Sequence, residues 1–301
     1  MNELKNKILA LKKERNAFIM AHYYQSLEVQ EIADAVGDSF ALAKQAQNAS
    51  QEIIIVCGVR FMAESAKILN PEKTVYQSNQ GAGCPMADMI TPEEVLELRG
   101  KYPEAAVVCY VNSSAAVKAV CDICCTSSSA EKVVRSLPNK QIVFVPDRNL
   151  GSYIAKMVPE KEVILFDGCC PIHDAVSEED ALKIIAENPG VKLLVHPECR
   201  VEVLAHADYI GSTAGILDYA RKSDDKAFII GTESGICEIL SHELPEKAFL
   251  PLKSGFICAD MKKTTLQDVL DCLEGKSTPV ELPERERNAA RASLERMVSV
   301  G

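Results

Sequence analysis

The sequence lacks any long uninterrupted apolar stretch and any run of basic residues. Its first segment, residues 1–16, reads MNELKNKILALKKERN and has no apolar core of a secretory signal. No later segment approaches the length of a membrane span. Acidic residues outnumber basic ones by 43 to 33, giving a formal net charge of -10, which argues against a nucleic-acid groove. We therefore expect a cytoplasmic protein with neither a membrane nor a nucleic acid as partner.

Cysteine, by contrast, is abundant, with 12 residues in a chain of 301. Disulfide frameworks belong mainly to short secreted proteins, so these thiols are expected to be free. Most should be buried as small apolar residues, a common role of free cysteine. The cysteines that fit this role, in strand or helix patterns, are Cys57, Cys109, Cys237 and Cys272. The role of Cys199, in a loop beside Glu198, is left open.

Three stretches of the sequence share one plan, with matching landmarks 85 to 88 positions apart. Each begins with a short apolar strand that ends in polar residues, at His22, Tyr110 and His196. A second strand led by aspartate follows, and then a serine at the start of a helical pattern. Two more strands lead to a cysteine loop and a helix with an N-capping pattern. Agreement at so many landmarks indicates an internal threefold repeat.

Short apolar strands that alternate with helical patterns predict βαβ units with parallel sheets. We expect an α/β fold of three similar three-layer αβα domains, at residues 1–103, 104–190 and 191–301. Extra polar helices at 1–15 and 283–298 would wrap the outside. In open α/β sheets, ligands bind beyond the carboxyl ends of the strands, which is where the landmarks lie. Three such edges facing one another would enclose a central cavity.

One cysteine in each copy lies in a loop directly after the fourth strand, namely Cys84, Cys170 and Cys258. Three thiolates from equivalent loops suit a soft metal centre, whereas structural zinc usually takes four ligands in closely spaced pairs. An iron–sulfur cube usually takes four cysteines, so three would leave one iron open to water or substrate. Cys170 is preferred to its neighbour Cys169 because, like Cys84, it precedes a proline.

A second cysteine group, Cys121, Cys124 and Cys125, also resembles a metal motif. We favour packing for this group, because Cys121 ends a helical pattern and the other two lie in an apolar strand. A redox role for these three cysteines, or for Cys169, is left open.

Polar side chains at the ends of the first strands are candidate active-site residues. They are His22, Tyr24, Tyr110, Asn112, His196 and Glu198. The repeat directs all of them toward the shared cavity, which favours function over packing. His206 and His242 have no such placement and are interpreted as structural. The sequence does not decide the role of His173, three residues after Cys170.

Ser39, Ser127 and the pair Ser212 and Thr213 each follow a strand at the start of a helical pattern. Serine and threonine commonly cap helix N-termini there. Their hydroxyls, with the backbone N–H groups of the first turn, also bind carboxylates or phosphate. The two roles are compatible, and in an acidic protein such local sites are the expected way to bind anions.

Several motifs occur in order along the chain: AHYYQ at 21–25, GDS at 37–39, GCPMA at 83–87, YVNS at 110–113, PDRNLG at 146–151, CPIH at 170–173, HPEC at 196–199, GST at 211–213 and MKK at 261–263. Together they resemble the quinolinate synthase family over about residues 15–275. Each motif is short, but the ordered set is specific.

The resemblance implies an enzyme of de novo NAD biosynthesis that condenses iminoaspartate with dihydroxyacetone phosphate to quinolinate, phosphate and two waters. It also implies a four-iron, four-sulfur cluster on Cys84, Cys170 and Cys258, with one iron not ligated by cysteine. The implied substrate contacts are His22, Ser39, Tyr110, Asn112, Ser127, His196, Glu198 and Thr213. Tyr24 is implied to lie close to the chemistry. A transient contact with an aspartate oxidase, the source of the unstable imine, is left open.

From the residue pattern and the family resemblance together, we expect the open iron to act as a Lewis acid that polarises a substrate oxygen for water loss. Glu198 and His196 on one side of the cavity, and Tyr24 and His22 on the other, are the expected acid and base groups. Their individual roles are not assigned. The alternatives are another four-iron hydro-lyase acting on a small dicarboxylate and, with less support, a non-enzymatic iron–sulfur carrier or sensor.

Overall fold

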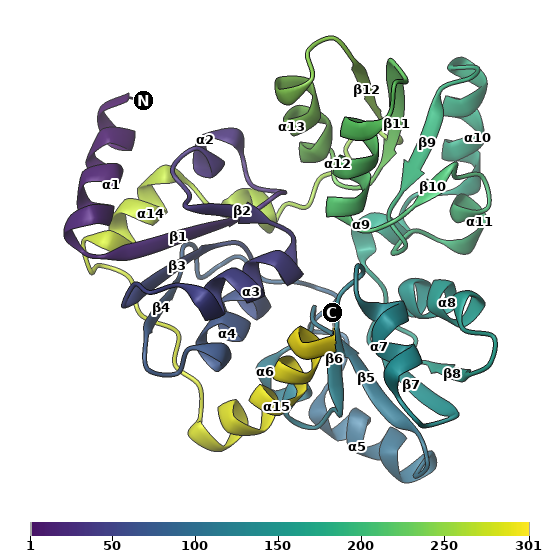
Figure 1. Cartoon of the computed structure of the whole chain (residues 1–301), viewed down its shortest axis with the longest axis horizontal. Coiled ribbons are helices and arrows are strands. Elements are labelled where there is room, and N and C mark those ends of the chain that lie inside the picture. The colour runs from purple at the N-terminus through teal and green to yellow at the C-terminus, as the bar shows by residue number, and fades with distance from the viewer. Residues whose placement is uncertain (1, 301) are drawn as a thin grey trace.

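Each sequence repeat forms a four-stranded parallel sheet flanked by helices (Figure 1). The structure is a computed structural model, and it describes residues 2–300. The first sheet has the order β2-β1-β3-β4 and consists of β1 (Ala17–His22), β2 (Ala35–Gly37), β3 (Ile53–Cys57) and β4 (Thr74–Gln77). The helices of this repeat are α1 (Asn2–Glu14), α2 (Leu27–Gln30), α3 (Ser39–Asn48), α4 (Arg60–Leu69) and α5 (Pro92–Lys101).

The second and third sheets repeat this order, as β6-β5-β7-β8 and β10-β9-β11-β12. The strands of the second are β5 (Ala106–Tyr110), β6 (Ile123–Cys125), β7 (Gln141–Val145) and β8 (Glu162–Leu165). Its helices are α6 (Ala115–Ala119), α7 (Ala130–Ser136), α8 (Arg148–Met157), α9 (Pro171–Asp174) and α10 (Glu178–Glu187). All strand pairs in the three sheets are parallel. The predicted fold class is therefore confirmed.

The third sheet contains β9 (Lys192–Val195), β10 (Tyr209–Ile210), β11 (Ala227–Gly231) and β12 (Ala248–Pro251). Its helices are α11 (Val201–Leu204), α12 (Thr213–Lys222) and α13 (Gly235–Glu243), and they are followed by the 3-10 helix η1 (Met261–Lys263), α14 (Leu266–Leu273) and α15 (Glu284–Val300). In each sheet the second strand pairs on one side of the first strand, and the third and fourth strands follow on its other side. This reversal between the first and third strands opens a crevice beyond their carboxyl ends.

An aspartate before the second strand fixes the register of the first two strands in every sheet. Its carboxylate accepts a hydrogen bond from a backbone N–H of the first strand, at 2.9, 2.7 and 2.8 Å in the three copies. Its own N–H donates to the carbonyl of that same residue, at 2.7, 3.0 and 2.9 Å. The pairs are Asp34 with Ile19, Asp122 with Val107 and Asp208 with Leu193. We call this two-way contact the aspartate clamp.

The helix that closes each repeat begins with a full capping box, in which side chain and backbone exchange hydrogen bonds. The capping pairs are Thr91 with Glu94, Ser177 with Asp180 and Thr265 with Asp268. The sequence predicted all three caps, and they are confirmed.

The closing helix packs against the sheet of the next repeat. Arg99 of α5 forms an ion pair with Asp122 at 2.8 Å, and Glu178 of α10 pairs with His206 at 2.8 Å. The last closing helix, α14, returns to the first sheet and packs beside α1 (Figure 1). The domain boundaries 1–103, 104–190 and 191–301 follow the sequence repeat and remain a proposal. In space, each closing helix packs against the sheet of another repeat.

The two terminal helices lie on the outside, as expected from their polarity. Helix α1 packs on β1, and α15 lies across α6 and β6 and contacts α4 (Figure 1). The buried residues of α15 are Ala290, Ser293, Leu294 and Met297. In the part of the chain that the structure describes, no helix has both the length and the apolar character needed to cross a membrane.

We predict that Asp208→Ala lowers the free energy of unfolding by about 1–3 kcal/mol, because the Leu193 N–H loses its carboxylate partner inside the sheet. Urea unfolding followed by circular dichroism measures this change. Asp224→Ala, at an exposed position of the same repeat, is the control and should change stability by less than about 0.5 kcal/mol. Equal stability of the two variants would contradict the role of the clamp.

Candidate functional site

A cavity of about 150 Å³ lies where the carboxyl edges of the three sheets meet. Its wall contains every predicted site residue except Ser212. These are His22, Tyr24, Ser39, Cys84, Tyr110, Asn112, Ser127, Cys170, His196, Glu198, Thr213 and Cys258. Residues far apart in the sequence are brought together because each sheet presents the same edge to the centre.

The serines differ from one another in position. Ser212 is the N-cap of α12 and accepts a hydrogen bond from the Gly215 N–H at 3.2 Å, while the next residue, Thr213, lines the cavity. Ser39 is the first residue of α3. Ser127 lies in a turn before α7, so the expectation that it starts a helix is wrong.

Two histidines at equivalent strand ends have the same local geometry. The Nδ1 atom of His22 accepts the Tyr24 N–H at 3.1 Å, and that of His196 accepts the Glu198 N–H at 3.3 Å. In each neutral ring the proton is therefore on Nε2. Burial lowers the pKa of His22 to about 3 and that of His196 to about 4. Both rings are thus neutral near pH 7 and can act as hydrogen-bond donors.

Glu198 is the buried charge at the centre of the site. Its Oε1 accepts the Tyr110 hydroxyl at 2.6 Å, and its Oε2 lies 2.8 Å from Nδ1 of His173. Burial acts to raise the pKa of Glu198, but His173 and His196 outweigh it and lower that pKa to about 2. The Asn149 side chain also donates to the Glu198 carbonyl at 3.0 Å. The carboxylate is therefore ionised and held from two sides.

Tyr24 is joined to Glu198 by a chain of hydrogen-bonding groups. Its hydroxyl lies 3.0 Å from Oγ1 of Thr213 and 2.7 Å from Oγ1 of Thr232. Nε2 of His173 is 3.1 Å from the same Thr232 oxygen. Burial, and then the charge of Glu198, raise the pKa of Tyr24 well above its usual value. The phenol therefore keeps its proton, and we call the series from Tyr24 to Glu198 the polar relay.

The three loop cysteines are free and partly buried on the same cavity. Burial raises the pKa of the Cys84 thiol to about 12, and it raises those of Cys170 and Cys258 as well. A bound cation would have to offset this cost to hold thiolates here. Cys170 lines the cavity, whereas its neighbour Cys169 is not part of the wall.

The spacing of possible ligands argues against a single ion held by the three thiols. Among the described residues, the one set of three or more ligand atoms within 4.8 Å of one another comprises Cys170, His173 and Glu198. The three loop thiols are not all within this limit of one another, whereas tetrahedral zinc would bring its sulfur ligands together within it. A polynuclear cluster suits this wider arrangement. The cavity is consistent with an iron–sulfur group.

Two contacts hold the cysteine loops in place. The Gly83 N–H donates to Oδ1 of Asp260 at 3.1 Å, which joins the first loop to the third. The Cys170 N–H donates to Oδ2 of Asp147 at 3.2 Å. The loops therefore depend on contacts between repeats as well as within them.

Several residues of the site were missed or undecided from the sequence. His173 belongs to the polar relay, and Glu233 lines the cavity beside Lys262, at 3.3 Å. Asp147 and Glu233 both stand two residues after the third strand of their repeats. Extending the repeat comparison to that position would have found them. Cys199 is buried with its thiol 3.6 Å from the Gly231 carbonyl, which supports packing.

Comparison with known proteins confirms the resemblance. Residues 6–299 match the family profile described as quinolinate synthetase A protein. The chain belongs to the quinolinate synthase family. The quinolinate synthase of Caldicellulosiruptor bescii is 50% identical over 298 residues, which cover 99% of this chain and 98% of the relative. That of Geobacter metallireducens is 49% identical over 297 residues, covering 99% and 97%.

A third quinolinate synthase, from Clostridium kluyveri, is 48% identical over 297 residues and 99% of this chain. These relatives are named as enzymes, and the match to them spans all three repeats. The match to the quinolinate synthase family therefore covers all three sheets and the cavity between them.

We predict that the protein loses stability as the pH falls from about 6.5 toward 4, since the unfolded chain takes up histidine protons before the folded chain does. The pKa of His22 is about 3 in the fold, so its share between pH 7 and 4.5 is about 2–3 kcal/mol. Urea unfolding at both pH values measures this. His22→Gln should weaken the pH dependence, and equal slopes in the variant and the unmodified protein would refute the assignment.

Proposed function

We propose that the chain condenses iminoaspartate with dihydroxyacetone phosphate to form quinolinate, phosphate and two waters in de novo NAD biosynthesis. The single observation that supports this most directly is the polar relay, because it places an ionised carboxylate and a protonated phenol in one cavity with three free thiols. Dehydration and condensation need such a separated base and acid. Family membership supports the same reaction.

Cys84, Cys170 and Cys258 would hold a four-iron, four-sulfur cluster with one iron not ligated by cysteine. Support comes from one free cysteine per repeat on the cavity wall and from the fact that the three thiols are not all within 4.8 Å of one another, as a single ion would require. When bound, the cluster would supply a Lewis acid that polarises a substrate oxygen for loss of water.

Within the polar relay, Glu198 is the proposed base, since it supplies an ionised carboxylate on the cavity wall, held by the Tyr110 hydroxyl and His173. Tyr24 is the proposed acid toward a leaving hydroxyl, since its protonated phenol lies on the same cavity wall and is linked to Glu198 through Thr232 and His173. His22 and His196, neutral and with Nε2–H, would donate hydrogen bonds to substrate oxygens.

Substrate binding is proposed for Asn112, Ser39, Ser127 and Thr213. The Oδ1 atom of Asn112 is buried on the cavity wall without a hydrogen-bond partner among the described residues. A buried acceptor of this kind is costly unless a ligand N–H or O–H meets it. Hydroxyls and helix N-termini near Ser39 and Thr213 suit carboxylates and phosphate. The imine would reach the cavity from an aspartate oxidase, by diffusion or by transient contact.

Anaerobic purification, iron and sulfide quantification and an assay for quinolinate from the two substrates together test the proposal. Another hydro-lyase of this cluster type would act on a small dicarboxylate without needing dihydroxyacetone phosphate. A carrier or sensor would hold the cluster but form no product. Absence of quinolinate from a fully loaded preparation would overturn the proposed reaction.

We expect Cys170→Ala to lose nearly all bound iron and sulfide and all activity, because one of three cluster ligands is gone. Cys169→Ala is the matched control one residue away and should keep both. Iron analysis of anaerobically reconstituted protein, with circular dichroism for the fold, makes the comparison. A Cys170→Ala variant with the iron content of the control would reassign the ligand.

Glu198→Gln should retain the cluster and lower turnover by about 10²–10⁴-fold, because the amide cannot accept the proton. Glu202→Gln, at an exposed position of α11, should behave as the unmodified enzyme. Iron content and steady-state rates separate the two effects. Turnover near normal in Glu198→Gln would remove this residue from the acid–base pair.

A further inference from the structure

Tyr24, the proposed acid, is held at both ends by residues of the third repeat. Its hydroxyl lies 2.7 Å from Oγ1 of Thr232, and its carbonyl accepts a hydrogen bond from Nζ of Lys262 at 2.7 Å. The side chain of the next residue, Gln25, donates to the Met261 carbonyl at 2.6 Å. The position of the phenol therefore depends on the third repeat as well as on the strand that carries it.

The Lys262 ammonium also pairs with a buried carboxylate of the cavity wall. Its Nζ lies 3.3 Å from Oε1 of Glu233, whose side chain has no exposed surface. Oε1 accepts no hydrogen bond from a described residue, so the charge of Lys262 compensates this end of the carboxylate. The Gly235 N–H donates to Oε2 at 2.9 Å. A Cβ atom at Gly235 would lie 2.7 Å from both Oε2 and Nζ, so glycine leaves room for the ion pair.

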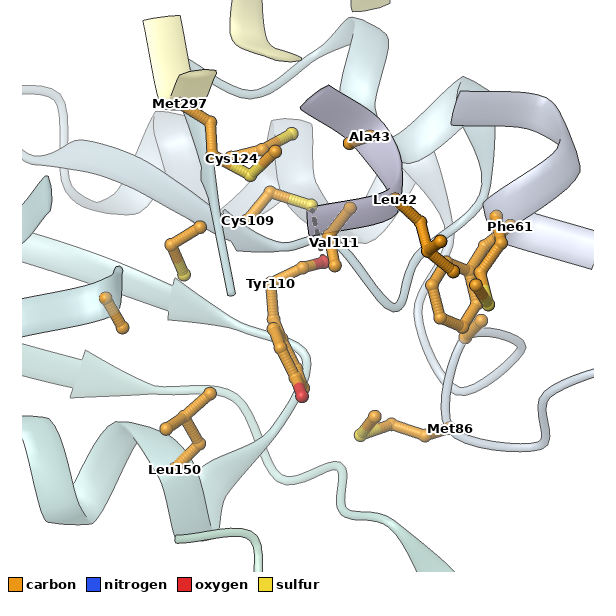
Figure 2. Close-up of a cluster of buried hydrophobic side chains, with 14 of the residues drawn as sticks. Leu42, Ala43, Phe61, Met86, Cys109, Tyr110, Val111, Cys124, Leu150 and Met297 are labelled. Atoms are coloured by element: carbon orange, nitrogen blue, oxygen red, sulfur yellow. Dashed lines mark hydrogen bonds between the residues drawn. The ribbon is translucent and has the colours of Figure 1, made fainter. Parts of the chain in front are cut away.

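Glu198, the proposed base, is anchored in the same way by the second repeat. Its carbonyl accepts a hydrogen bond from the Asn149 side chain at 3.0 Å, and that amide also donates to Asp174 at 2.9 Å. Its carboxylate accepts the Tyr110 hydroxyl at 2.6 Å. Figure 2 shows the Tyr110 ring directed away from the packed side chains around Cys109. Glu198 is therefore held at its backbone and at its side chain, as Tyr24 is.

The two anchors occupy matching positions of the repeat. Lys262 and Asp174 each stand four residues after a loop cysteine, Cys258 and Cys170 respectively. The proposed acid and base each stand two residues after a strand-end histidine. In both cases a polar pair from one repeat meets the carbonyl of the reactive residue in the next repeat around the ring. Its recurrence at both reactive residues points to a role in the reaction.

We propose that Lys262 is a positioning residue, which holds the Tyr24 turn so that the phenol stays in the polar relay. Glu233 in turn fixes the ammonium beside the Tyr24 carbonyl. Lys262 touches no reacting atom and acts through Tyr24. A misplacement of about 1 Å in a reacting group can lower a rate by about 100-fold. The effect on the reaction rests on the proposed function, whereas the anchoring of the turn does not.

Steady-state rates of the anaerobically loaded enzyme, expressed per bound cluster, test this role. We expect Lys262→Met, which keeps the length of the side chain, to lower kcat by about 10–100-fold with the KM of both substrates little changed. Lys262→Arg, which keeps a charged donor, should lose less. A fall in turnover that only follows lost iron, or a raised KM at normal kcat, would overturn the role.

Lys253 provides the matched control in the same repeat. Its ammonium likewise donates to a carbonyl and a carboxylate, those of Ala175 at 2.9 Å and Asp180 at 2.8 Å. It is not part of the cavity wall. Lys253→Met should therefore unfold at a lower urea concentration and keep its kcat. An equal loss of kcat in the Lys253 and Lys262 variants would show general loosening and contradict the proposal.

A double-mutant cycle with Tyr24→Phe tests whether Lys262 acts through the phenol. Groups that act as a unit have strongly non-additive effects on turnover. In the Tyr24→Phe background, Lys262→Met should therefore lower kcat by less than about 3-fold. Two single losses that multiply in full would place the action of Lys262 elsewhere and overturn the assignment.

Hydrogen–deuterium exchange of the loaded enzyme follows the turn without any reaction. The Tyr24 and Gln25 N–H groups both bond to His22, so a loosened turn exposes them to exchange. A peptide covering residues 22–30 should exchange faster in Lys262→Met but not in Lys253→Met. Unchanged exchange in Lys262→Met would refute the anchor. Faster exchange, with no quinolinate formed by the unmodified enzyme, would refute the proposed reaction while the anchor stands.

Discussion

The shared direction of the strands within each sheet is the constraint on which the rest of this structure depends. Parallel strands need crossover connections, so all carboxyl ends, with the loops that follow them, lie at one edge. The aspartate clamp repeats in each sheet and fixes the first strand against the second. Three sheets with the same order then direct equivalent edges to one centre. Cys84, Cys170 and Cys258 share a cavity for this reason.

The polar relay shows what such an arrangement makes available. Tyr24 comes from the first repeat, His173 from the second, and Glu198 and Thr232 from the third. A buried carboxylate would be costly on its own, and His173 and Tyr110 of the second repeat, with His196 of its own repeat, compensate its charge. The pKa values of Glu198 and Tyr24 move in opposite directions within one network. The acid and base properties therefore belong to the assembled ring and to no single sheet.

The fold class and most of the cavity wall could be predicted from the sequence. Equivalent strand ends recur at matching intervals along the chain, so the residues at those ends can be aligned between repeats. His22, Tyr110 and His196 could be aligned without any knowledge of tertiary contacts. His173 and Glu233 were harder, since their partners Glu198 and Lys262 lie 25 and 29 positions away in the chain, respectively. Ser127 was misplaced because a turn separates it from α7. The packing of each closing helix against the sheet of another repeat could not be predicted from the sequence, since a capping box predicts where a helix starts but not which sheet it covers.

The return of α14 to the first sheet has a consequence for synthesis of the chain. Leu266, Val269 and Leu270 cover an apolar face formed by Ile19 and Ile55, which are made more than two hundred positions earlier. A ribosome that has finished the first sheet has therefore not yet made the helix that shields it. The nascent protein must carry this uncovered surface until its last segments emerge, a period in which chaperones can bind it and aggregation competes with folding.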